Sequence, residues 1–231
     1  EKFQCILTDP QKKQVLDILP SRKADSLYAY FSGFSNRRQV ELVVMDMSSL
    51  FRSVAKNTFP HAKIIADKYH VVRLVNWAFE NVRKREQKRF HDQRRKYFKG
   101  SRRLLLKPPD TLTAQQFEEV SHMLSLSKDL AKAYYLKGEF NKLMKSKNIL
   151  EAKQHLSNWF MHAGASNLQE FNTCINTFTN WQEEILNAFR YGFTNGYTEG
   201  CNNRIKVIKR TAYGMRNFDR FRTRILHTMS C

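Results

Sequence analysis

The mostly apolar segment Val40–Met45 places the strongest limit on what this chain can fold into. Its flanks indicate a strand buried on both faces, which requires a sheet covered by helices. The strand ends at Asp46. A second apolar strand, Lys63–Ala66, ends at Asp67, and a helix is predicted between the two strands, from Ser48 to about Asn57. This region predicts an α/β fold in which each strand is followed by an aspartate.

The residues before this pair of strands predict a hairpin and a helix. Phe3–Thr8 and Gln14–Leu19 are strand-like runs joined by a turn through Asp9 and Pro10. Residues 21–34 have helical spacing and end at a break that contains Gly33. Two antiparallel strands are therefore expected first in the chain.

From Tyr69 onward the apolar spacing becomes helical and remains so. One helix is expected to run to about Phe98, and Pro108-Pro109 marks a break. The further segments that are expected to be helical are 113–126, 128–145, 149–160, 168–189 and 198–209.

The charge of the chain indicates a polyanionic partner. Forty Lys and Arg against 21 Asp and Glu give a net charge of +19, and such an excess attracts phosphates and releases their counterions. Residues 73–107 carry 13 basic and three acidic residues, a net of +10. The alternative is a ribosome-associated or merely solvated basic surface. Five aromatic residues in this basic segment are expected to be core contacts rather than platforms for stacked bases: Trp77, Phe79, Phe90, Tyr97 and Phe98.

The cysteines and the apolar runs bear on location. Cys5, Cys174, Cys201 and Cys231 lie far apart and form no CxxC pair, so we expect reduced thiols in a cytoplasm rather than a zinc site or disulfides. No apolar run reaches 18 residues, and the first residues do not resemble a signal peptide. A protein that neither spans a membrane nor is secreted is expected.

Asp46 and Asp67 are candidate metal ligands. Residues at the carboxyl ends of adjacent strands face the crevice in which open α/β sheets bind their ligands. The alternative for Asp46 is a turn-forming or helix-capping role before Met47-Ser48-Ser49.

The stretch 194–224 carries a second candidate site. At about 100° per residue, Glu199, Asn203, Lys206 and Arg210 share one helix face, and Cys201, Ile205 and Ile208 share the opposite face. A carboxylate in line with an amide and two cations suits a metal ligand beside a phosphate chain. An ordinary amphipathic helix would explain the stripe, but not the eight Lys and Arg between residues 204 and 224.

Four blocks of the sequence resemble successive blocks of the ISL-three family of bacterial insertion-sequence transposases, which are of the Asp-Asp-Glu type. These blocks are VLDILPSRKADSLYAYF, VVMDMSSLFRSV, FPHAKIIADKYHVVRLVNWA and TNGYTEGCNNRIKVIKRTAYGMRNFDRFRTRIL, and residues 108–190 are the least distinctive part. The resemblance implies an α/β, ribonuclease H-like core interrupted by a long all-α insertion. Residues 1–70 would begin the core, 71–190 would form the basic helix and the insertion, and 191–231 would hold the catalytic-glutamate helix and the basic end.

The resemblance also implies roles for four residues. Asp46 matches the second catalytic aspartate and Glu199 the catalytic glutamate, and together they would be metal ligands. Asp67 and His70 match a D-x-x-H signature to which we assign a supporting role.

The family's first catalytic aspartate lies on its opening strand, and alignment puts that strand upstream of Glu1. Asp9 and Asp17 are the nearby substitutes, but both belong to the expected hairpin. The family's amino-terminal zinc-binding and helix-turn-helix regions have no counterpart in these residues.

The implied function is metal-dependent DNA cleavage and strand transfer at insertion-sequence ends. Two Mg²⁺ or Mn²⁺ ions are expected as cofactors. Double-stranded DNA, as transposon ends and as target, is the expected partner of a nucleoid-associated, cytoplasmic homodimer. The residues expected to bind DNA are Arg83, Lys84, Lys88, Asn202, Asn203, Arg204, Lys206, Lys209, Arg210, Arg216 and Arg220.

Two alternatives remain open. A nuclease with the same core, such as a junction resolvase, would share the metal ions but should lack the TEGCNNRIK and YGMRNF blocks. A catalytically inactive, DNA-binding remnant of a transposase would keep those blocks, and the position of the first aspartate leaves this alternative standing.

Overall fold

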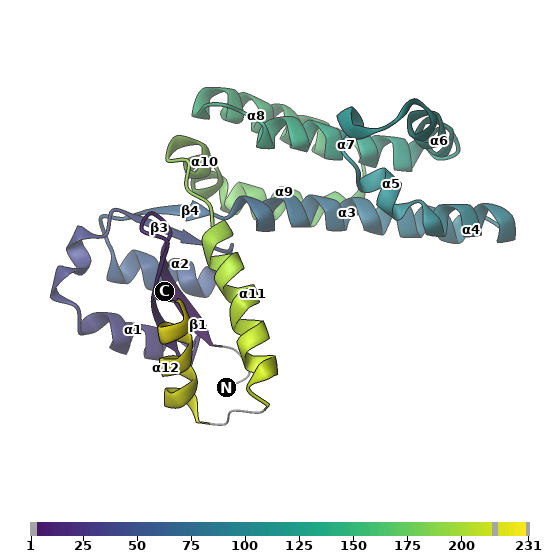
Figure 1. Cartoon of the computed structure of the whole chain (residues 1–231). Coiled ribbons are helices and arrows are strands. Elements are labelled where there is room, and N and C mark those ends of the chain that lie inside the picture. Colours follow the sequence, from purple (N-terminus) through teal and green to yellow (C-terminus); the bar gives the residue numbers. More distant parts are fainter. Residues whose placement is uncertain (1–3, 214–216, 230–231) are drawn as a thin grey trace. The chain divides into compact units, whose positions relative to one another are not determined.

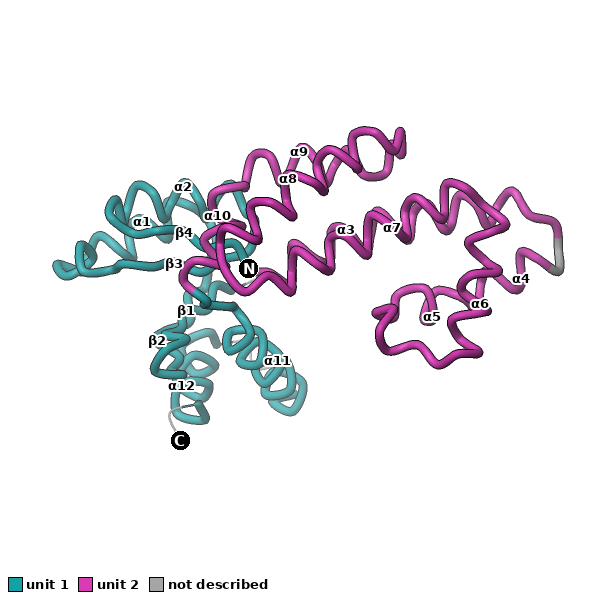
Figure 2. Tube along the Cα trace, turned by 90° about the horizontal axis from the view of Figure 1, so that it is seen from above, with its two compact units in different colours: residues 1–67, 192–231 teal, residues 68–191 magenta. Residues whose placement is uncertain are grey.

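The computed structural model describes residues 4–213 and 217–229. The chain divides into two compact units (Figure 2). Unit 1 comprises residues 1–67 and 192–231, and unit 2 comprises residues 68–191. Most of the elements are helices, and the strands form small sheets in unit 1 (Figure 1).

Unit 1 begins with the predicted hairpin. Strands β1 (Cys5–Asp9) and β2 (Gln14–Leu19) pair antiparallel, with Cys5 opposite Leu19. The Asp9 carboxylate accepts hydrogen bonds from the backbone N–H groups of Gln11 and Lys12 at 2.9 and 3.0 Å, which stabilises the turn. The prediction of two antiparallel strands is confirmed.

The predicted strand–helix–strand segment is also present. Strands β3 (Leu42–Met45) and β4 (Lys63–Ala66) are parallel, and helix α2 (Ser49–Thr58) connects them. Before β3 come helix α1 (Ala24–Ser32), whose Leu27 packs near Val54 of α2, and the short 3₁₀ helix η1 (Ser35–Gln39). Among the described residues the strands form two separate two-stranded sheets, β1–β2 and β3–β4. An α/β fold with a helical bulk is therefore confirmed, whereas the ribonuclease H-like core stays a prediction.

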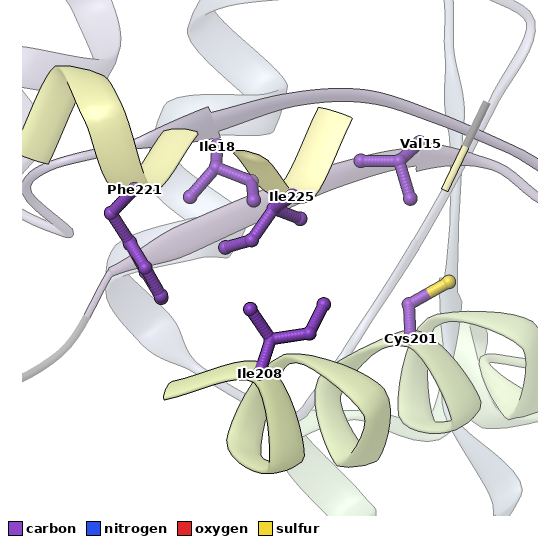
Figure 3. Packing of buried hydrophobic residues seen from close by; sticks show 6 residues of the cluster. All are labelled: Val15, Ile18, Cys201, Ile208, Phe221 and Ile225. Carbon is purple, nitrogen blue, oxygen red and sulfur yellow. The ribbon is translucent and has the colours of Figure 1, made fainter. Parts of the chain in front are cut away.

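Two helices from the end of the chain cover the hairpin. Val15 and Ile18 of β2 pack with Cys201 and Ile208 of α11 (Gly196–Thr211) and with residues of α12 (Phe218–Met229) (Figure 3). The prediction that Cys201, Ile205 and Ile208 share one face of this helix is confirmed, because Ile205 packs against the same cluster. Helix α12 was not expected. It contributes Phe221 and Ile225, four residues apart, to this cluster.

Unit 2 is entirely helical in its described residues. Helix α3 (Lys68–Arg89) packs along α7 (Lys128–Met144), which packs along α8 (Ile149–Ala165). Its core contains Phe140, Trp159 and Phe178, whose ring centroids lie 5.2 to 5.4 Å apart. The remaining elements are α4 (Asp92–Gly100), α5 (Arg102–Leu106), η2 (Pro109–Thr111), α6 (Ala114–Ser125), η3 (Gln169–Phe171), α9 (Asn172–Asn180) and α10 (Gln182–Arg190).

The helix expected to reach Phe98 breaks in two. Helix α3 ends at Arg89, and His91 adopts an extended backbone, with φ −82° and ψ 155°, before α4. The break allows Phe98 to be fully buried and to stack on Phe90, with a centroid distance of 4.7 Å. Residues 168–189 likewise break, at Trp181 between α9 and α10.

The prediction that the aromatic residues of the basic segment are core contacts is correct only in part. Phe79 and Phe98 are fully buried. Trp77, however, is 55% exposed and Tyr97 is also exposed, so for these two the prediction is wrong.

Candidate metal centre

Asp46 and Asp67 follow the ends of two paired strands. The parallel register places Met45 opposite Ala66, and the Asp67 N–H donates to the Met45 carbonyl at 2.9 Å. Both aspartates therefore leave the sheet at the same edge, as the sequence predicts. Asp67 is buried, with 3% exposure, and Asp46 is half-buried.

Asp46 does not cap the helix that follows it. The N-cap of α2 is Ser48, whose hydroxyl oxygen accepts from the Phe51 N–H at 3.4 Å. The alternative of a capping role for Asp46 is therefore wrong.

Asn195 links the two aspartates. Its side-chain Nδ2 donates to Asp46 Oδ1 at 3.4 Å, and its backbone N–H donates to Asp67 Oδ1 at 3.3 Å. Asn195 directly precedes α11 and lies 149 and 128 residues from these partners in the sequence. Asn195 thus forms a hydrogen bond with each of the two carboxylates that follow β3 and β4.

The backbone that leads to Asn195 contains a position that requires glycine. Gly192 follows the end of α10 and has φ +72°, a conformation that L side chains rarely adopt. Sequence reasoning missed Asn195, because an Asn-Gly pair is typical of a turn. The signal that could have identified it is its position one helical turn before Glu199.

Asp46, Asp67 and His70 form a group that could hold a metal ion. One potential ligand atom of each residue lies within 4.8 Å of the others, and no other such group occurs in residues 4–213 and 217–229. Carboxylate oxygens are the ligands that Mg²⁺ prefers, and a set that adds an imidazole nitrogen also suits Mn²⁺. The donor set therefore fits the expected cofactors.

Glu199 is not one of the members of this group. It is half-buried in the first turn of α11, and its N–H donates to the Asn195 carbonyl at 2.9 Å. The neighbouring Thr198 hydroxyl forms a 2.7 Å hydrogen bond with Thr8 of β1, which fixes the start of α11 against the hairpin. Glu199 follows Asn195 by four residues, which corresponds to about 6 Å along the helix axis.

Asp17, a substitute for the first catalytic aspartate, is engaged elsewhere. Its carboxylate accepts from Tyr30 Oη at 2.8 Å and from Arg222 Nε and Nη2 at 2.6 and 3.0 Å. Burial raises the pKa of Asp17, but these hydrogen bonds and that from the Ile18 N–H outweigh burial, so the pKa is lowered. Asp17, like Asp9 in its turn, is not a member of the metal group.

Most of the residues expected to bind DNA are exposed. Lys84 and Lys88 are exposed on α3, and Arg220 is exposed on α12. Arg216 lies outside the described residues. The exposed members on α11 are Asn202, Asn203, Arg204, Lys206, Lys209 and Arg210.

Arg83 is the exception. It is 4% exposed, and its guanidinium donates to both Glu80 carboxylate oxygens, at 2.8 and 2.6 Å, and to the Phe98 carbonyl at 2.6 Å. These bonds occupy the guanidinium inside unit 2, which argues against a contact between Arg83 and DNA.

None of the helices in the described residues combines the length and the apolar character needed to cross a bilayer.

Comparisons with known proteins identify relatives along most of the chain. A family model described as "Transposase", for the ISL-three group, matches residues 1–225. The transposase for insertion sequence element IS1001 of Bordetella parapertussis is 29% identical over 225 residues, which cover 95% of this chain and 55% of that protein. The transposase for insertion sequence element IS1557 of Mycobacterium tuberculosis is 22% identical, with coverage of 94% of this chain and 54% of that protein.

A shorter match has a different name. A protein named "ATP-dependent protease" from Lactococcus lactis subsp. lactis is 33% identical over 107 residues, but this match covers only 46% of the chain. The transposase matches cover twice as much of the chain and therefore decide the family. The chain spans about half the length of the curated transposases it matches. No solved structure gives a significant match.

Proposed function

Because the chain belongs to the ISL-three family of transposases, we propose that it contributes the metal-dependent centre that cuts and joins DNA at insertion-sequence ends. The observation that carries the proposal is the bridge from Asn195 to Asp46 and Asp67. It connects the carboxyl ends of two strands to the start of the helix that bears Glu199, so three separate elements meet at one place.

Asp46 is the proposed metal ligand of this group, and Asp67 and His70 are proposed to support it. Divalent ions held there would supply the activation of water or a 3′-hydroxyl as the nucleophile and the stabilisation of the leaving 3′-oxygen. Asn195 would orient both carboxylates by donating one hydrogen bond to each. Such hydrogen bonds fix the direction of a ligand oxygen and its basicity.

Glu199 is proposed as a further ligand from α11. One turn separates it from Asn195, and a glutamate side chain is long and has several rotatable bonds. The resemblance assigns it the catalytic glutamate. We propose that the Glu199 carboxylate reaches the group formed by Asp46, Asp67 and His70.

Duplex DNA is the proposed partner of the basic face of α11. Lys206, Lys209 and Arg210 are exposed there, and Arg204 is exposed on another side of the same helix. Phosphate contacts of this kind position the backbone and contribute affinity more than sequence choice. A homodimer on DNA is proposed only by analogy with the family.

Mn²⁺ binding to the chain tests the metal centre directly. Titration calorimetry with Mn²⁺ should show binding that is lost in Asp46→Asn and is weakened about 10- to 100-fold in Asp67→Asn and in Asn195→Ala. Two exposed residues of unit 1 supply matched controls, since Asp219→Asn and Asn36→Ala should leave binding unchanged. Equal binding by Asp46→Asn and Asp219→Asn would contradict the proposal and favour an inactive, DNA-binding remnant.

A further inference from the structure

One face of α3 carries exposed aromatic and basic side chains together. Tyr69, Arg73, Trp77, Lys84 and Lys88 are all exposed, and their spacings of four and seven residues place them within roughly 100° of arc on one side of the helix. From Tyr69 to Lys88 this stripe extends about 28 Å, at about 1.5 Å per residue. We call these five residues the α3 stripe.

The exposure of Trp77 has no explanation in the packing of unit 2. The opposite side of α3 already provides a complete apolar face through Val71, Val75, Phe79 and Val82, all fully or nearly fully buried. The other two tryptophans, Trp159 and Trp181, are buried as this residue type usually is. Trp77 is 55% exposed and Tyr69 is 57% exposed.

The acidic residues of α3 add little exposed negative charge to the stripe. The two acidic residues of α3, Glu80 and Glu86, are only 7% and 5% exposed, although helical spacing places Glu80 within the arc of the stripe. Glu80 accepts from Arg83 at 2.6 Å, and Glu86 accepts from the Ser127 hydroxyl at 3.0 Å. The face that solvent meets is therefore cationic with two flat aromatic surfaces.

Aromatic surfaces alternating with cations fit a nucleic acid strand whose bases are unpaired. Bases stack on the aromatic rings irrespective of sequence, and the cations follow the phosphates. Duplex DNA would use the cations but not the rings, because its bases are already stacked. A protein partner would match the rings but would need an acidic face of its own.

We propose that the α3 stripe binds a single strand of DNA, with Trp77 stacking on an unpaired base and Arg73, Lys84 and Lys88 contacting its phosphates. The choice of DNA rests on the proposed function, but the stacking is independent of the metal centre. Binding should therefore persist when no divalent ion is present.

Tryptophan fluorescence provides the measurement, because Trp77 is the exposed tryptophan and the other two are buried. The probe is a single-stranded oligothymidylate of about 12 nucleotides, within the site sizes of roughly 4 to 16 known for such surfaces, in buffer with EDTA. Binding should quench the Trp77 emission and protect it from acrylamide. A duplex of the same length should do neither.

Substitutions separate stacking from charge. Trp77→Ala should weaken oligothymidylate binding roughly 5- to 150-fold without changing its salt dependence, and Trp77→Phe should retain most of the affinity. Phe117→Ala, which removes an aromatic ring that is 59% exposed on α6, is the matched control and should have no effect. Lys84→Ala with Lys88→Ala should reduce the slope of log K against log salt by about 1.4.

Three outcomes would overturn the inference. These are an emission unaffected by the oligonucleotide, equal affinities of Trp77→Ala and Phe117→Ala, and a change in self-association of Trp77→Ala in sedimentation, which would assign the stripe to a protein interface. Loss of Mn²⁺ binding at the metal centre has no bearing on these readouts. Failure of the proposed function and failure of this inference are therefore distinguishable.

Discussion

Asp17 and Arg222, 205 residues apart in the sequence, form an ion pair with two hydrogen bonds that fastens α12 to the hairpin. Asp17 is buried on β2, and Arg222 is half-exposed on α12. Tyr30 of α1 donates a third hydrogen bond to the same carboxylate. A basic residue within the arginine-rich end of the chain thus has a structural role, because it pairs with a buried carboxylate.

Asp17→Asn should destabilise the protein by roughly 1 to 3 kcal/mol at pH 7, because it weakens charge-assisted hydrogen bonds to a buried group. The folded-state pKa of Asp17 is lowered, so its contribution is present above the ordinary carboxyl pKa and is lost as the pH falls through the folded pKa. Urea unfolding at pH 7 and at pH 3 measures this. The difference between wild type and Asp17→Asn should shrink at the lower pH, and a constant difference would exclude the charge as its cause.

Asp46→Ala and Glu199→Ala should each abolish strand cleavage when made in a transposase as long as the curated relatives. The affinity for duplex DNA should stay within a few fold of that of the unsubstituted protein. Each substitution removes a proposed metal ligand and leaves the phosphate contacts intact. Cleavage of labelled insertion-sequence ends, together with gel-shift binding, measures both properties. Retained cleavage would remove the substituted residue from the site.

Asp67→Asn and His70→Ala should reduce cleavage by about 10- to 100-fold if these residues support the site from outside the ligand shell. Their membership in the group with Asp46 makes a larger effect informative. Complete loss of cleavage in Asp67→Asn, with unchanged urea stability, would assign Asp67 as a ligand.

Replacing Lys206, Lys209 and Arg210 together by Ala should reduce the slope of log K against log salt for duplex DNA by up to ~2.7, at ~0.9 per phosphate contact. All three side chains are exposed on α11. The control replaces Lys128, Lys147 and Lys153 of unit 2, which are also exposed, and removes the same charge. Identical slopes for the two triple variants would show that net charge alone, not the α11 face, attracts DNA.

Lys137→Met should change how stability depends on alkaline pH. Lys137 is buried and donates to the Leu105 and Lys107 carbonyls at 2.6 and 3.3 Å, and burial lowers its pKa to about 8. Above that pKa the folded chain has released a proton that the unfolded chain still holds, so the contribution of Lys137 to stability increases with pH. The difference in unfolding free energy between wild type and Lys137→Met should therefore increase between pH 8 and pH 10.

Lys128→Met, on the exposed side of the same helix, is the control for Lys137→Met and should show no such pH dependence. The same alkaline slope in both variants would show that Lys137 titrates like a solvated lysine.

The local elements could be predicted from the sequence because their signals are local. The apolar runs before Asp46 and Asp67 define two strands, and the helix between them makes the strands parallel neighbours. The apolar face of α11 follows in the same way from the spacing of Cys201 and Ile208.

The missed features depend on contacts that spacing does not encode. The Asn195 bonds join residues more than a hundred positions apart. The burial of Arg83 depends on Glu80 and on the carbonyl of Phe98, and a count of basic residues cannot distinguish a paired guanidinium from a free one. Trp77 was misjudged because the apolar face of α3 is complete without it.

The division of unit 1 into two stretches of sequence has a consequence for how the protein is made. The bonds that complete unit 1 span 128 to 205 residues, and closing loops that long is entropically costly and slow. Unit 2 is one continuous piece whose Lys68 ammonium lies 3.8 Å from the Phe189 ring centroid, so once folded it brings its own two ends together. We therefore expect unit 2 to fold first during synthesis. Its folding would bring the chain segments before residue 68 and after residue 191 together, so that Asn195 can form its hydrogen bonds with Asp46 and Asp67. A translation product that stops before residue 195 would have a folded helical unit but would lack the hydrogen bonds of Asn195 to Asp46 and Asp67.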